Sequence, residues 1–263
     1  MIVYPEIDPI IFSIGFVKVR WYGLMYVIGF LFAWWLARKR SQAPHSLIKQ
    51  AEHVDDLIFY AMLGVILGGR IGSVIFYNWP TFSDNPLYLL KIWEGGMSFH
   101  GGLIGVIIAM WLFGRKHGLK MWQVTDFMAP FVPLGLGFGR IGNFINGELW
   151  GKETDVAWGV LYNGKVLHAS QLYEAALEGF VLFAILWWYS SRPRPYMAVS
   201  GLFFLLYGVF RFFIEFVRVP DQHIGYLAGG WVTMGQVLTA PMIIIGATML
   251  FMAYTRNSKE AAA

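Results

Sequence analysis

Seven long apolar runs dominate the 263-residue chain and restrict what it can fold into. A helix needs about 20 mainly apolar residues to cross the ~30 Å hydrocarbon core of a bilayer, and each run is close to that length. Only 14% of the residues are charged, whereas soluble domains average about 25%. The sequence therefore predicts an all-α, polytopic integral membrane protein and excludes a soluble globule, a disordered chain and a collagenous fibre. The runs are 21–37, 57–77, 97–114, 122–139, 172–189, 199–216 and 232–254.

The loops between these runs predict an orientation. Eleven Lys and Arg residues fall in the loops on one side and six in the loops on the other. Because the richer side is usually cytoplasmic, we expect the N-terminus outside and the C-terminus in the cytoplasm. The same excess accounts for the pI of about 9.2 without a nucleic-acid partner. We expect a single domain over 1–263, with a small outer head at about 141–170.

Four residues carry a positive or potentially positive charge within or beside the runs: Arg70, His100, Arg140 and Arg211. At 1.5 Å per residue, the helix geometry places all four in the outer half of the membrane. Ionisable groups at such depth are costly and usually functional. We therefore expect a cationic cavity near the outer face.

Guanidinium groups in such a cavity suit planar oxyanions such as a phosphodiester or a carboxylate. The alternative is that the arginines form buried salt bridges or reach outward to the interface, with Glu215 and Glu148 as partners in sequence reach. For Arg70, the neighbouring glycines favour close helix packing. His100 is of the residue type that most often acts as a base near neutral pH, or it is a hydrogen-bonded core residue.

The glycines also have two interpretations. The run 135–142 offers a backbone cradle for phosphate, while pairs four residues apart, such as Gly64 with Gly68 and Gly101 with Gly105, favour helix packing. The segment 142–148 is too polar for hydrocarbon and is expected to line a water-filled cavity. The chain has no cysteine, no HExxH, no Walker loop and no GxSxG motif, so we expect neither a metal nor a cofactor.

Five motifs, in order, resemble those of the bacterial prolipoprotein diacylglyceryl transferases. They are 21–26 (WYGLMY), 95–102 (GGMSFHGG), 139–148 (GRIGNFINGE), 170–174 (SQLYE), and 207–218 with Tyr207, Arg211, Glu215 and Arg218. The resemblance covers nearly the whole chain. It implies a seven-span protein of the bacterial inner membrane with its active site in the outer, periplasmic half.

The resemblance also implies a reaction and roles for residues. The family transfers the diacylglyceryl group of phosphatidylglycerol to the lipobox cysteine thiol of a preprolipoprotein, forms a thioether and releases glycerol 1-phosphate. Arg140 and Arg211 are expected to bind the phosphate, and His100 to act on the thiol. Tyr207 is expected to assist Arg140, Arg211 and His100 in catalysis. Further roles are implied for two groups: Tyr22, Gly142, Asn143, Asn146 and Glu148 at the lipid, and Glu215, Arg218 and Arg70 in support.

Two functions of other classes were weighed against this enzyme. A transporter or flippase for anionic lipid would use the same arginines, but it predicts internal repeats that the sequence does not display. A receptor or assembly factor leaves a cavity of Arg, His and Glu unexplained. The enzyme is therefore the preferred prediction.

Overall fold

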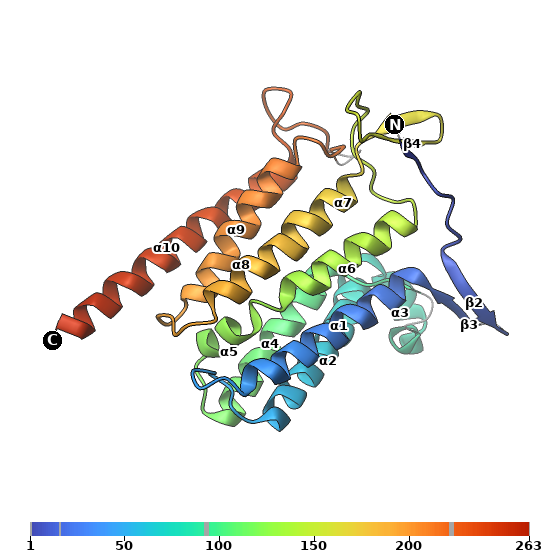
Figure 1. The fold of residues 1–263 in the computed structure, drawn as a ribbon. Helices are drawn as coiled ribbons and strands as arrows, with labels where there is room; N and C mark the ends of the chain where they lie inside the picture. Colours follow the sequence, from blue (N-terminus) through green and yellow to red (C-terminus); the bar gives the residue numbers. More distant parts are fainter. Residues whose placement is uncertain (1, 16, 92–94, 221–223, 263) are drawn as a thin grey trace. The chain divides into compact units, whose positions relative to one another are not determined.

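The computed structural model describes residues 2–15, 17–91, 95–220 and 224–262, and most of them are helical (Figure 1). The helices are α1 Trp21–Ser41, α2 Ala51–Tyr77, α3 Trp79–Asp84, η1 Pro86–Leu90, α4 Phe99–His117, α5 Met121–Met128, α6 Val132–Ile145, α7 Ser170–Glu174, η3 Ala175–Val181, α8 Leu182–Tyr189, α9 Ala198–Ile214 and α10 Met234–Ala262. The strands are β1 Ile2–Val3, β2 Ile10–Ile14, β3 Val17–Arg20, β4 Val160–Tyr162 and β5 Lys165–Leu167.

Each apolar run is mainly helical, which confirms a mainly helical membrane protein. Within the described residues, three helices are both long enough and apolar enough to cross a bilayer: Ala51–Tyr77, Ser170–Tyr189 and Met234–Thr255. Ala198–Ile214 is a shorter apolar helix. The number of seven spans and the orientation stay predictions.

The run expected as one helix over 122–139 is instead two helices, so that prediction is wrong. α5 ends at Met128, and α6 begins at Val132 with Pro133 in its first turn. Pro130 between them has no N–H to continue the hydrogen bonding of α5. α6 extends to Ile145, beyond the predicted end at 139, so Arg140 lies inside the helix.

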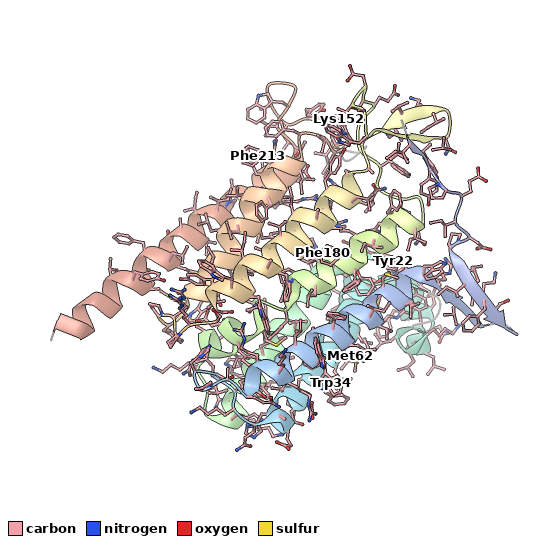
Figure 2. All side chains as sticks on the ribbon, in the orientation of Figure 1. Tyr22, Trp34, Met62, Lys152, Phe180 and Phe213 are labelled. Atoms are coloured by element: carbon pink, nitrogen blue, oxygen red, sulfur yellow. The ribbon has the colours of Figure 1, made fainter. Side chains whose placement is uncertain are left out.

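The chain divides into two compact units, and the boundaries fall within α1 and at the end of α5. Unit 1 contains Met1–Leu36 and Met128–Ala263. In it α9 packs along α10, and α6 packs against η3. The second contact is close because a Cβ added at Gly179 would lie 2.6 Å from the Cα of Gly137. Apolar side chains are exposed on the surface of this unit, for example Phe213, which is 62% exposed near the end of α9 (Figure 2).

Small strands in unit 1 were not expected from the sequence. β1 pairs in parallel with β4, and β4 pairs antiparallel with β5 across a tight turn at Asn163 and Gly164. Both turn residues have positive φ, as a type I′ hairpin requires. The hydroxyl of Tyr4 donates to the backbone oxygens of Phe144 and Ile145 at 2.8 and 2.9 Å. This head therefore holds the C-terminal end of α6.

Unit 2, Ala37–Phe127, is built around the pair α2 and α4. A Cβ added at Gly105 would lie 2.0 Å from the backbone oxygen of Gly64, and one at Gly101 would lie 2.3 Å from that of Gly68. The predicted packing role of these glycines is confirmed. The phosphate-cradle interpretation of 135–142 is wrong, because these residues lie within α6, where backbone N–H groups bond to preceding carbonyls.

Candidate active site

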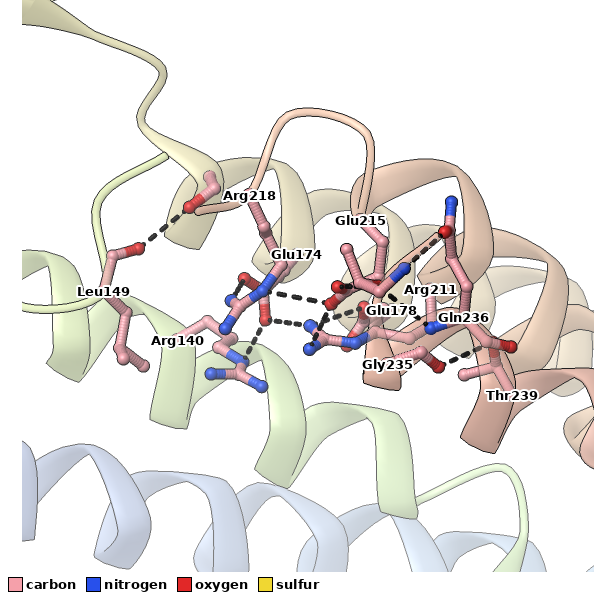
Figure 3. A network of polar contacts seen from close by, with 12 residues as sticks. Arg140, Leu149, Glu174, Glu178, Arg211, Glu215, Arg218, Gly235, Gln236 and Thr239 are labelled. Carbon is pink, nitrogen blue, oxygen red and sulfur yellow. Dashed lines mark hydrogen bonds and ion pairs between the residues drawn. The ribbon is translucent and has the colours of Figure 1, made fainter. Parts of the chain in front are cut away.

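Glu174 lies at the centre of a cluster of ion pairs in unit 1 (Figure 3). Its side chain is fully buried, and Oε2 lies 2.7 Å from Nε of Arg140 and 2.9 Å from Nη1 of Arg211. Arg218 donates to the other oxygen, Oε1. The arginines come from α6, from α9 and from the segment after α9. A buried charge is costly unless it is paired, and this carboxylate has three guanidinium partners.

The helix that carries Glu174 changes its winding immediately after this residue. α7 ends at Glu174, and η3 continues as a π-helix over Ala175–Val181 before α8 resumes the α-helix. Such π-helical insertions occur frequently at functional sites. Glu178 lies on η3 and is also buried, with Oε1 3.7 Å from Nη1 of Arg211. This helix therefore presents two carboxylates, four residues apart, to the arginine of α9.

Glu215, at the end of α9, forms a second centre. Its Oε1 lies 2.6 Å from Nη2 of Arg211 and 3.2 Å from Nε of Arg218. Its Oε2 accepts a hydrogen bond of 2.7 Å from the hydroxyl of Thr233. Glu215 thus holds the guanidinium of Arg211 on the side opposite to its bond with Glu174.

The start of α10 closes around Glu215. The backbone N–H of Thr233 donates to the side-chain oxygen of Gln236, and the N–H of Gln236 donates to the hydroxyl of Thr233, which is a reciprocal capping box. A Cβ added at Gly235 would lie 2.4 Å from Cδ of Glu215. Next to these groups lies a cavity of about 40 Å³, lined by Arg211, Glu215, Arg218, Val219, Thr233, Met234 and Gly235.

Arg140 and Arg211 differ in how many of their Nη groups are free of carboxylate partners among the described residues. Both Nη groups of Arg211 already face carboxylates, of Glu174 and Glu178 on one side and of Glu215 on the other. Arg140 contacts Glu174 through Nε, and among the described residues its two Nη groups have no ion-pair partner (Figure 3). Because these groups form a planar fork, Arg140 offers a two-point contact to an oxyanion.

Polar side chains gather at the C-terminal end of the helix that carries Arg140. Nδ2 of Asn143 and of Asn146 lie 3.4 and 2.9 Å from the carboxylate of Glu148. The ring of Tyr22 packs on Gly142, where an added Cβ would lie 2.9 Å from its Cδ2. The structure thus brings together these five sequence-predicted residues, all within unit 1.

Tyr207 and Arg211 lie four residues apart on α9 and therefore on one face of that helix. The ring of Tyr207 stacks on Phe203, with ring centroids 5.8 Å apart and planes inclined by 13°. This stacking holds the phenol ring on the face of α9 that carries Arg211.

Arg70 and His100 belong to unit 2. Arg70 is buried, and its guanidinium donates to backbone oxygens of Leu89 at 3.1 Å, Gly95 at 2.5 Å, Gly96 at 3.3 Å and Tyr88. It therefore fixes the loop before α4 through backbone oxygens, which neither interpretation of Arg70 predicted. His100 is exposed in the first turn of α4, and its ring centroid lies 5.6 Å from that of Phe99.

The principal residues that sequence reasoning missed are Glu174 and Glu178. Both lie within an apolar run, so the rule that directed attention to Arg70 and Arg211 applies equally to them. Glu174 also ends one of the five motifs. Within the described residues, no three His, Asp or Glu side chains are grouped as metal ligands.

A hydrogen-bonded chain beside this cluster joins Tyr173 of α7 to two residues that precede the helix. Trp158 Nε1 donates to the hydroxyl of Tyr173 at 2.8 Å, and this hydroxyl lies 3.1 Å from Nδ1 of His168. Burial lowers the pKa of His168 below its usual value; Asp155 opposes this shift and Lys152 adds to it. His168 is therefore held mainly in its neutral form near pH 7.

Comparisons with known proteins identify the family of the chain. The family model for prolipoprotein diacylglyceryl transferase matches residues 9–252. A protein of Methylococcus capsulatus is 57% identical over 98% of this chain and 100% of its own length, and one of Azotobacter vinelandii is 55% identical over 99% and 100%. Both are named phosphatidylglycerol--prolipoprotein diacylglyceryl transferase. The family model and these full-length identities show that the chain belongs to the prolipoprotein diacylglyceryl transferase family.

Proposed function

We infer that this chain transfers the diacylglyceryl group of phosphatidylglycerol to the cysteine thiol of a preprolipoprotein lipobox. The sulfur forms a bond to the glyceryl carbon, the bond from that carbon to the phosphate oxygen breaks, and glycerol 1-phosphate leaves. The product is a thioether, and the reaction is the first step of bacterial lipoprotein maturation. Relatives of that name, 53–57% identical and matched over nearly their full length, support this reaction.

One observation carries the assignment of the site, namely the open guanidinium fork of Arg140. Glu174 anchors the group through Nε, so the two Nη groups are fixed in direction before a ligand arrives. A phosphodiester presents two oxygens at the matching spacing. Negative charge grows on the phosphate as the carbon–oxygen bond breaks, and a fixed cation there stabilises the transition state.

The other residues are proposed in roles around this contact. Arg211 contributes charge and fixes Glu174, while Glu215 and Arg218 orient Arg211. Arg70 fixes the loop before α4 and so supports the site indirectly. The glycerol head group and the lipid beside it are proposed to contact Tyr22, Tyr207, Gly142, Asn143, Asn146 and Glu148.

His100 is the proposed base for the thiol, which is unreactive until it loses its proton. The nucleophile comes from the substrate, which is consistent with an enzyme without cysteine. The proposed chemistry requires neither a metal nor a cofactor.

The proposed setting is the bacterial inner membrane. The seven apolar runs support seven spans, and the excess of basic residues in one set of loops supports an N-terminus outside. The site then lies in the periplasmic half of one membrane domain.

The test uses the purified protein in liposomes that contain phosphatidylglycerol, with a synthetic lipobox peptide carrying one cysteine. We expect the peptide to gain one diacylglyceryl mass, with an equal amount of glycerol phosphate released. A matched peptide with serine in place of cysteine is the control and should stay unmodified. Movement of lipid across the bilayer without a peptide adduct would contradict the transferase and favour the transporter.

A further inference from the structure

Glu178 is the one carboxylate of this cluster without a close partner among the described residues. It is 1% exposed, and neither oxygen has a hydrogen bond there. Its nearest cation is Nη1 of Arg211 at 3.7 Å, and that group lies closer to Glu174, at 2.9 Å. The surroundings of Glu178 therefore differ from those of Glu174 and Glu215, which each have two or more close cationic contacts.

The groups that face Glu178 give it little compensation. Arg211 and Tyr207 face it from α9, Arg140 from α6, Arg218 from the segment after α9, and Glu174 from its own helix. The three arginines are already bound to Glu174 or Glu215. A buried carboxylate that is not hydrogen-bonded is among the most costly groups in a protein, and taking up a proton removes most of this cost.

The net charge of the ion-pair cluster depends on whether Glu178 is ionised, and this charge decides how well the cluster attracts an anionic substrate. Three arginines and three ionised glutamates give a neutral cluster, which has no charge to attract an anion. If Glu178 is neutral, the cluster has a net charge of +1, which equals in magnitude the single negative charge of a phosphodiester. The open fork of Arg140 is the place where that charge is available.

We propose that Glu178 carries a proton in the resting enzyme and thereby sets the charge of the arginine cluster to match an anionic phosphodiester lipid. Glu178 is a positioning residue that acts through Arg211 and does not itself contact the lipid. The proposal rests on the proposed function, since it concerns the lipid bound by the same site.

The experiment compares two neutralising variants on one helix, E178Q and the matched control E174Q. Glutamine resembles a protonated glutamate, so E178Q should transfer within about threefold of the wild-type rate. E174Q removes the shared partner of three partly buried arginines and should lose at least about 100-fold. As pH rises, the KM for phosphatidylglycerol should increase in the wild type relative to E178Q, while the ratio of their kcat values stays constant.

Infrared spectroscopy provides a measurement that is independent of turnover. The wild type minus E178Q difference spectrum at pH 7 should contain the carbonyl band of a protonated carboxylic acid. That band without any transfer by the wild type would reject the proposed function and leave the protonation intact. Absence of the band overturns the proposal, as does an E178Q protein that fails to fold or transfers at less than a tenth of the wild-type rate.

Discussion

The hydroxyl of Thr233 donates a 2.7 Å hydrogen bond to Oε2 of Glu215, and through this bond the first turn of α10 holds the carboxylate that pairs with Arg211. Thr233 is also the capping residue of α10, and its side chain is buried. One side chain therefore fixes both a helix start and an ion pair of the candidate active site.

Replacing Thr233 with valine removes the hydroxyl and keeps the shape of the side chain. A hydrogen bond to a buried charged group contributes about 1.5–3 kcal/mol, so we expect T233V to transfer at least about tenfold more slowly. The lost cap should also reduce the free energy of unfolding by about 1 kcal/mol. Initial rates and thermal unfolding measure the two effects, and T233S, which keeps the hydroxyl, should restore both. Wild-type rates in T233V would show that this bond does not position Glu215.

Gly235 tests the same arrangement by adding an atom. The Cβ of G235A would lie 2.4 Å from Cδ of Glu215, so the carboxylate has to move away from Arg211. Overpacking of this kind costs about 1–3 kcal/mol, and we expect transfer to slow about tenfold or more. G135A is the control, because a Cβ at that helical position has no neighbour within 4 Å. Equal losses in both variants would indicate a general effect of removing glycine from these helices.

Arg140 is expected to tolerate no substitution, lysine included. Lysine keeps the positive charge, but it has neither the Nε that binds Glu174 nor the planar fork. We expect R140K to lose at least about 100-fold in kcat/KM. The lysine ammonium is not held in one direction toward the phosphate, and Glu174 loses one of its three cationic partners. Kinetics across a range of phosphatidylglycerol concentrations measure this loss. Full activity in R140K would contradict the role of the fork in binding phosphate.

Sequence alone predicts much of this protein because its strongest signals are local. Runs of about 20 apolar residues require helix in a bilayer, and glycines four residues apart predict the close contact of α2 with α4. The partners of Arg140 and Arg218 could not be predicted, because they depend on which helices pack together. Glu174 is 34 residues from Arg140 and 44 from Arg218, so no helical spacing relates them. Pro130 is a local signal for a helix break, but it lies inside a continuous apolar run, and the length of that run predicted one helix.

The head should lose stability at acidic pH because of His168. Burial lowers the pKa of His168 in the folded protein, so the unfolded chain binds more protons once pH falls below about 6.5. Stability is therefore fully present above the usual histidine pKa and is lost as pH decreases toward the folded value. Thermal unfolding at pH 7.5 and pH 5.5 should reveal a decrease in the wild type that is smaller in H168Q. An equal decrease in both proteins would assign the acid sensitivity to other groups.

We expect the buried Arg70 to contribute to the stability of the fold and not directly to the transfer reaction. Its guanidinium binds four backbone oxygens, and it lies 4.4 Å from the ring centroid of Tyr88. R70M leaves those carbonyls unpaired, so we expect a loss of about 3 kcal/mol or more in the free energy of unfolding. K49M, an exposed position in the same unit, should leave stability unchanged. The transfer rate per folded R70M molecule should stay within about threefold of wild type, because four of the five N–H donors of this guanidinium are bonded to backbone oxygens and no two-point contact is left for a phosphate. A stable R70M protein with a large loss of kcat would contradict this and place Arg70 in contact with the lipid.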